Sequence, residues 1–159
     1  MTDRIHTHPG CAVSSCGGVS LLLWTGEPTL AANQWAVRTL LDGRNATDPE
    51  VSLLQIVAQS AGTPDAQSRA YIQEVYKREL SGVRRLVNAP LGDSFRQAIV
   101  RTIMRSMAVF AGKTAHITVV STLDAAYTAV LEKRTTPTRA ALEAQVRAMF
   151  AALGAEPPA

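Results

Sequence analysis

The clearest pattern of hydrophobic and polar positions in this chain lies in residues 83–121. Leu86-Val87 and residues 117–120 are short β-favouring apolar runs, typical of strands in a sheet covered by helices. Between these runs, apolar residues recur every three or four positions and form one stripe of a helix: Phe95, Ile99, Ile103, Met107 and Phe110. Asp93 or Ser94 can cap that helix with a side-chain oxygen. The spacing predicts a strand, a helix and a second strand that join as a right-handed crossover between parallel strands.

The pattern of hydrophobic and polar positions also predicts the strands and helices of the N-terminal half. Residues 12–16 and 19–25 are predicted to form a β-hairpin, because Gly17-Gly18 between them is a strong turn signal. A helix is expected from its cap Thr29 to Gly43, with an inner face of Leu30, Val37, Leu40 and Leu41. Residues 51–58, VSLLQIVA, predict a central strand buried on both sides. A second helix is expected from about residue 65 to 80, with an inner face of Ile72, Val75, Tyr76 and Leu80.

Two further helices are predicted after the crossover. Thr122 is expected to cap the first, whose core-facing residues are Leu123, Ala126, Tyr127, Val130 and Leu131. The second is expected to begin at Thr136 and Pro137, since proline at the first helical position loses no hydrogen bond. Its apolar face consists of Leu142, Val146, Met149, Phe150 and Leu153. That face can cover the protein's own core or pack in a dimer, and the first is the more ordinary arrangement.

The predicted order is a hairpin followed by α, β, α, β, α, β, α and α. It indicates an α/β fold with a mixed, mostly parallel sheet covered by helices, and an extra C-terminal helix. A chain of 159 residues is long enough for one domain with its own core. Residues 1–10 are polar and include Pro9-Gly10, so we expect a flexible tail there, a domain over residues 11–134, and an appended helix and tail over 135–159.

This order of elements resembles the STAS domain, the fold of anti-sigma-factor antagonists and SpoIIAA-like proteins. The similarity covers about residues 12–133: the hairpin, VSLLQIVA as central strand, GVRRLVNAP before the crossover helix, and AHITVVST followed by LDAAYTAVLEK. It implies a non-catalytic regulatory or protein-interaction module of a bacterial-type signalling system. Its partner would be a regulatory protein or a second copy of the chain. An open α/β fold of flavodoxin type is the alternative for the same order.

In STAS regulators a serine within an Asp-Ser-Ser-Gly-like run, at the start of the helix after the central strand, is phosphorylated to switch partner binding. The corresponding residues 59–68 lack that run, and their hydroxyl groups are those of Ser60, Thr63 and Ser68. A phosphate there would be stabilised by the positive end of the helix dipole. The more ordinary interpretation is that Thr63 or Asp65 simply caps the helix.

A ligand site is expected beyond the carboxyl ends of the strands, where helix amides point into the crevice of an open α/β sheet. The candidate ligand- or anion-binding residues are Gln59, Asn88, Ser94 and Arg96. Arg96 falls within the apolar arc of its helix, so it either faces this crevice or extends past the sheet edge as a solvated or paired arginine. Arg101 and Arg105 lie opposite the apolar stripe and are expected to be solvated.

Composition and charge restrict the classes of partner that we expect for this chain. The net charge of +3 is too small to indicate nucleic acid, although residues 77–113 hold eight basic residues and two acidic ones, which suits an anionic partner or a solvated surface. Nucleic-acid binding would require Arg84, Arg85, Arg101 and Arg105 on one exposed face, and we do not expect it. No apolar run approaches the roughly 20 residues of a membrane span. The N-terminus lacks a secretory pattern, so we expect a cytoplasmic protein.

Metal and catalytic patterns are weak. His6, His8, Cys11 and Cys16 are metal-competent, but their spacing matches no known metal module, and the two cysteines should face opposite sides of a strand. The sequence has no phosphate-binding glycine loop, nucleophile turn or carboxylate pair spaced for acid–base chemistry. We therefore expect no metal, no cofactor and no enzymatic activity. The alternative to an interaction module is a small-molecule or lipid-binding protein that uses the crevice at the carboxyl ends of the strands.

Overall fold

A computed structural model describes residues 3–43, 51–78, 83–110 and 117–159. Its centre is a six-stranded sheet with the strands in chain order. The strands are β1 (His6–His8), β2 (Cys11–Cys16), β3 (Val19–Trp24), β4 (Val51–Val57), β5 (Val83–Pro90) and β6 (Ile117–Val119). The helices are α1 (Leu30–Asp42), α2 (Ala66–Arg78), α3 (Phe95–Phe110), α4 (Leu123–Leu131) and α5 (Arg139–Ala152).

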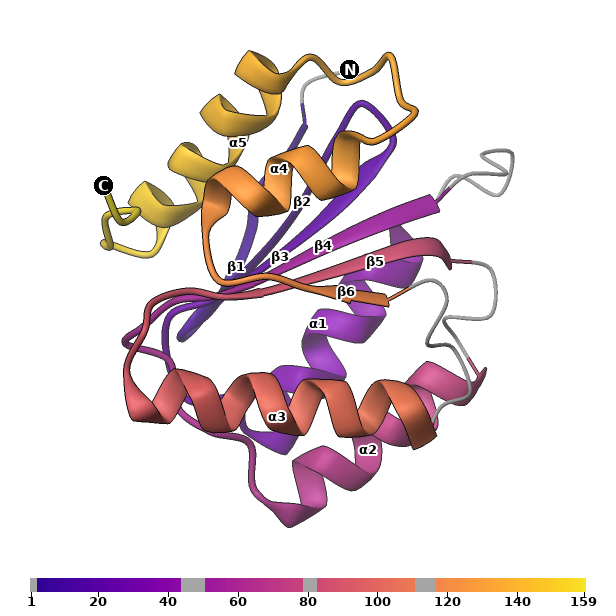
Figure 1. Cartoon of the computed structure of the whole chain (residues 1–159), viewed down its shortest axis with the longest axis vertical. Helices are drawn as coiled ribbons and strands as arrows, with labels where there is room; N and C mark the ends of the chain where they lie inside the picture. The colour runs from indigo at the N-terminus through magenta and orange to yellow at the C-terminus, as the bar shows by residue number, and fades with distance from the viewer. Residues whose placement is uncertain (1–2, 44–50, 79–82, 111–116) are drawn as a thin grey trace.

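The sheet is mixed and mostly parallel. β1, β2 and β3 are antiparallel neighbours, whereas β3, β4, β5 and β6 run parallel. The predicted α/β class is confirmed, including the N-terminal hairpin and the C-terminal helix. The crossover helices α1, α2 and α3 lie on one face of the sheet, and α4 and α5 cover the other (Figure 1). Crossovers of one hand between neighbouring strands return to the same face, which explains this arrangement.

The first strand differs from the sequence prediction. A flexible tail was expected for residues 1–10, but His6–His8 pair antiparallel with the start of β2. The β1 side chains are largely exposed, so the strand is held by backbone hydrogen bonds. Because no side chain of β1 has to enter the core, the sequence of this strand shows no alternation of apolar and polar residues. Gly10 has a φ of 78°, and its carbonyl accepts hydrogen bonds from the amides of Thr25 and Gly26 at 2.9 and 3.0 Å. The Pro9-Gly10 pair is therefore part of the turn between β1 and β2.

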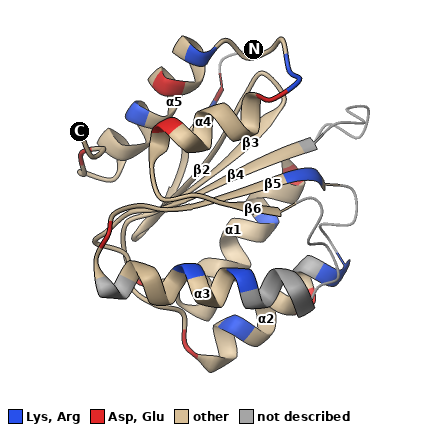
Figure 2. Cartoon of the chain, viewed as in Figure 1, with Lys and Arg blue, Asp and Glu red and all other residues tan. Residues whose placement is uncertain are grey.

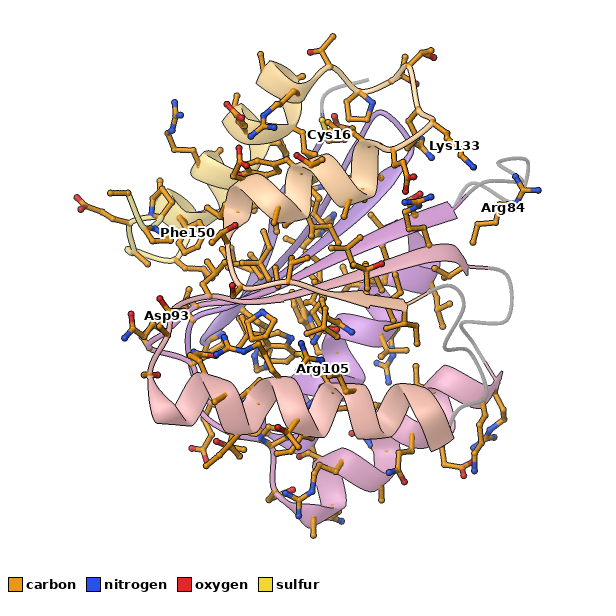
Figure 3. The ribbon with its side chains drawn as sticks, in the orientation of Figure 1. Cys16, Arg84, Asp93, Arg105, Lys133 and Phe150 are labelled. Carbon is orange, nitrogen blue, oxygen red and sulfur yellow. The ribbon has the colours of Figure 1, made fainter. Side chains whose placement is uncertain are left out.

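One core layer lies between the sheet and helices α4 and α5. Alternate strand residues enter it, among them Leu21, Leu23, Leu54, Ile56 and Val87, each at most 1% exposed. α5 contributes Leu142, Val146, Met149 and Phe150, again at most 1% exposed; Phe150 is labelled in Figure 3. α5 therefore covers the protein's own core, as the more ordinary of the two expected arrangements has it.

The second core layer lies between the sheet and helices α1, α2 and α3. The buried residues of α1 in this layer are Ala32, Asn33 and Ala36. The predicted inner face of α1 is therefore wrong in part. Half-buried Leu40 packs against this layer, but the other three predicted members are half-buried and do not belong to it: Leu30, Val37 and Leu41. The small side chains of Ala32 and Ala36 let the helix backbone approach the sheet closely, which hydrophobic periodicity alone does not reveal.

Helix α3 is rotated about its axis relative to the predicted stripe. Val100 and Met104 face the sheet with 4% and 6% exposure, whereas Ile99 is 41% exposed. Ile103 is half-buried and lines a cavity together with Ile72 of α2, so the side of α3 that carries Ile99 and Ile103 is turned toward α2. The other predicted members, Phe95, Met107 and Phe110, have side chains outside the described residues.

Side-chain caps begin the helices much as expected. Thr29, Ser94 and Thr122 accept hydrogen bonds from backbone amides three residues later, at 3.2, 3.2 and 3.1 Å. The exception is α5, which begins at Arg139 with Thr138 as its cap, two residues after the predicted start. The Thr138 hydroxyl oxygen accepts a hydrogen bond from the amide of Ala141 at 3.2 Å, which caps the helix at that position.

Candidate functional site at the carboxyl edge of the sheet

The parallel strands β3, β4 and β5 end at one edge of the sheet, and backbone hydrogen bonds hold the loops that follow. The amide of Ala58 donates to the carbonyl of Trp24 at 2.8 Å, and the amide of Leu91 donates to that of Val57 at 2.9 Å. The amide of Gly92 bonds to the carbonyl of Ser121 at 3.3 Å. This edge is the left side of Figure 3, where Asp93 is labelled. The loops thus form an ordered rim around any site at this edge.

The four residues predicted to bind a ligand do not form one open site. Gln59 is exposed on the rim, and a Cβ added at Gly92 would lie 3.2 Å from its Oε1. Asn88 is 1% exposed, and the Ser94 hydroxyl is used as the α3 cap. The side chain of Arg96 lies outside the described residues. Gln59 and Ser94 therefore belong to the rim, whereas Asn88 is within the core.

Two polar side chains from α3 occupy the crevice instead. Gln97 is fully buried and donates from Nε2 to the carbonyl of Ala58 at 3.1 Å. Arg101 donates from Nη1 to the carbonyl of Gly92 at 2.8 Å. The expectation that Arg101 is simply solvated is wrong. Its signal in the sequence was the four-residue spacing from Gln97, which places both residues on one helix face, opposite carbonyls at the strand ends.

The three candidate phosphorylation residues occupy different environments. Ser60 is exposed, and its hydroxyl donates to the carbonyl of Thr25 at 2.9 Å. Thr63 is half-buried, and Ser68 is fully buried within the first turn of α2. Asp65 caps α2, because its Oδ1 accepts the Ser68 amide at 2.7 Å, and this hydrogen bond lowers the pKa of the Asp65 carboxyl. Of the three residues, Ser60 is the most exposed.

The cysteines are buried in different layers. Cys11 faces the layer of α1, α2 and α3, and Cys16 faces the layer of α4 and α5, which confirms that they point to opposite sides of the strand. Burial raises the pKa of the Cys11 thiol to about 12, and burial together with nearby Asp3 raises that of Cys16. Among the residues that the structure describes, no three potential metal ligands come together.

A cleft lies between the β5–α3 loop, the start of α4 and the outer side of α5. We call it the edge cleft; its volume is about 750 Å³, and it is lined by residues 91–93, 121–124, Tyr127, Arg139, Glu143, Arg147 and 157–159. A volume of this size is within the range of cavities that bind ligands. α5 supplies one wall, so this cleft depends on the helix appended to the resembled fold.

Charged groups organise the floor of the edge cleft. Arg139 forms ion pairs with Asp124 of α4 and with Glu143, the latter at 2.7 Å. Its guanidinium carbon lies 5.6 Å from the centre of the Tyr127 ring, and burial, with a contribution from Glu143, raises the pKa of that phenol to about 12. Arg147 is exposed on the cleft wall, and no ion pair joins it to another residue in the described ranges.

Sequence reasoning missed these cleft residues. The available signal was the spacing of Arg139, Glu143 and Arg147, which places three charges on one side of a helix. Arg139 and its two carboxylate partners, Asp124 and Glu143, together carry one net negative charge, and Arg147 is a second cation of the cleft that no ion pair engages within the described residues.

The basic segment of the chain does not form a single positive face. Figure 2 shows Lys and Arg on α2 and α3 and a mixture of both signs on α4 and α5. Arg85 donates to the carbonyl of Ala129 at 2.8 Å and pairs with Glu132 at 2.5 Å, on the α4 side of the sheet, while Arg101 binds the Gly92 carbonyl. The arrangement that nucleic-acid binding would require is therefore not present among these arginines.

Comparison with known proteins adds no family to this description. The chain matches no model of a known protein family and no curated protein sequence. Within the described segments, no helix has the length and apolarity needed to cross a membrane.

Proposed function

We propose that this chain is a non-catalytic regulatory module, similar in kind to STAS domains, that binds a partner protein in the edge cleft. The observation that carries the proposal is the cleft itself, with Arg147 exposed on its wall beside the fixed Arg139–Glu143 pair. A free guanidinium at the side of a cleft suits a carboxylate on a partner segment, because such pairs form directional, charge-assisted hydrogen bonds.

The sequence resemblance supports the same class of function. The order of elements resembles that of STAS domains, whose role is regulation through protein partners. The partner is a regulatory protein or a second copy of this chain. In the crevice beneath the rim, Gln97 and Arg101 already donate hydrogen bonds to the carbonyls of Ala58 and Gly92, whereas the edge cleft has an open volume of about 750 Å³.

The test compares capture of partners by the full chain and by two charge-reversal variants. Arg147→Glu reverses the cation in the edge cleft, and Arg38→Glu makes the same change on the exposed side of α1, on the other face of the sheet. We expect one protein, or the chain itself in a sedimentation experiment, to bind the wild type and Arg38→Glu but not Arg147→Glu. Equal capture by all three chains, or no specific capture, would contradict the proposal.

A further inference from the structure

Of the five charged residues that line the edge cleft in the described part of the chain, three form one cluster. Arg139 pairs with Asp124 and with Glu143, and the three together carry one net negative charge. The guanidinium carbon of Arg139 also lies 5.6 Å from the centre of the Tyr127 ring. Because two carboxylates and an aromatic ring already engage Arg139, this cation is not available to an anionic group of a partner.

The other two charges of the edge cleft have opposite signs and lie on different walls. Arg147 belongs to α5, and Asp93 belongs to the loop between β5 and α3 and is labelled in Figure 3. Both residues are exposed, and neither forms an ion pair with another described residue. Burial raises the pKa of Tyr127, and the positive charge of Arg147 opposes that shift, so the guanidinium lies near the phenol. The cleft therefore offers one cation and one anion to a partner.

Apolar surface accompanies these two charges. Leu123 at the start of α4 and Pro157 after α5 are half-buried residues of the cleft wall. The walls come from the β5–α3 loop, from α4 and α5, and from the segment after α5, and they enclose about 750 Å³ of open space. A chain segment that fills the cleft therefore meets a carboxylate, a guanidinium and apolar side chains.

We propose that the partner segment bound in the edge cleft carries an acidic residue that pairs with Arg147 and a basic residue that pairs with Asp93, with apolar residues between them. This inference rests on the proposed function and adds the chemistry of the partner. A segment with acidic residues alone would bring a carboxylate close to Asp93 and to the net-negative Arg139 cluster, and a segment with basic residues alone would bring a cation close to Arg147. Like charges placed together at an interface reject a partner, so the two signs select a segment that carries both.

Immobilised synthetic decapeptides are the probe. Each peptide has a background of alanine, leucine and glycine, and one Glu and one Lys are placed at every pair of positions. Two control sets carry two Glu or two Lys at the same positions. We expect the full chain to bind Glu/Lys peptides of one preferred spacing at least about tenfold more tightly than either control set, the effect of one charge-assisted hydrogen bond. Equal binding of the Glu/Lys and Glu-only peptides, or no peptide bound above background, would overturn the proposal.

Variants at Asp93 test the basic residue of the partner. Asp93→Lys is expected to change the preference from Glu/Lys peptides to Glu-only peptides by about tenfold, because it replaces the anion of the cleft by a cation. Asp93→Asn is expected to remove the preference for lysine without reversing it. Asp42→Lys is the matched control, since Asp42 is exposed at the end of α1 and does not line the edge cleft. It is expected to bind the same peptides as the wild type.

Arg147→Glu separates this inference from the proposed function on which it rests. It is expected to change the preference from Glu/Lys peptides to Lys-only peptides. If Arg147→Glu has that effect while both Asp93 variants bind as the wild type does, the cleft accepts an acidic segment and the inferred basic residue is wrong. If Arg147→Glu leaves the selection of peptides unchanged, the proposed function fails together with this inference.

Discussion

Replacing Met104 by alanine tests the orientation of α3, where the hydrophobic pattern and the structure disagree. Met104 is 6% exposed and packs on the sheet beside Val100, and such a truncation in a core costs about 2–5 kcal/mol. For Met104→Ala we expect the free energy of unfolding to fall by about 3 kcal/mol. Ile99 is 41% exposed, so Ile99→Ala gives up only part of the roughly 1.5–3 kcal/mol of a fully buried side chain. Alanine also has a higher helix propensity than isoleucine, and this offsets a few tenths of a kcal/mol of that loss. The expected cost of Ile99→Ala in the free energy of unfolding is therefore about 1 kcal/mol or less.

Urea unfolding followed by circular dichroism measures both changes. With a slope of about 2 kcal/mol per molar urea, the midpoint is expected to fall by about 1.5 M for Met104→Ala and by no more than about 0.5 M for Ile99→Ala. Arg105→Ala, at an exposed position of the same helix, is the control and is expected to leave the midpoint nearly unchanged. If Ile99→Ala costs as much as Met104→Ala or more, α3 presents the predicted stripe to the sheet, and the described orientation is wrong.

Three further predictions concern single groups. Burial raises the pKa of Tyr127 from 10 to about 12. The neutral phenol therefore contributes to the stability of the fold fully below about pH 10, and this contribution is lost as the pH rises through about 12. In a pH titration followed by tyrosinate absorbance, we expect a late ionisation step that is absent in Tyr127→Phe. Cys11, whose pKa is about 12, is expected to resist a disulfide reagent at pH 8 in the folded protein and to react at once in denaturant, and fast labelling of the native thiol would contradict its burial. Thr138→Ala removes the α5 cap and is expected to lower the free energy of unfolding by about 1 kcal/mol in the same urea assay, whereas Thr135→Ala, before the helix, is the matched control.

The predicted site residues show where sequence reasoning reached its limit. Ser94 was correctly recognised as a cap, because a cap contacts an amide only three residues away. Arg101 was expected in solvent, but its guanidinium binds the carbonyl of Gly92 across the loop between β5 and α3. The charges of the edge cleft meet across two helices, as in the pair of Arg139 and Asp124. Such contacts depend on how the helices are placed, and a single sequence does not encode that placement in any local pattern.

The amino-acid sequence by itself determined the order of the elements, the hairpin, the buried central strand and nearly every helix cap. These features depend on the alternation of side chains within one segment and on hydrogen bonds over a few residues. Only the tertiary structure decided that His6–His8 join the sheet, that α1 packs through Ala32 and Ala36, and that Met104 rather than Ile99 faces the strands. Each of these outcomes is set by contacts between segments far apart in the chain, where backbone pairing, close approach and buried hydrogen bonds outweigh the local hydrophobic pattern.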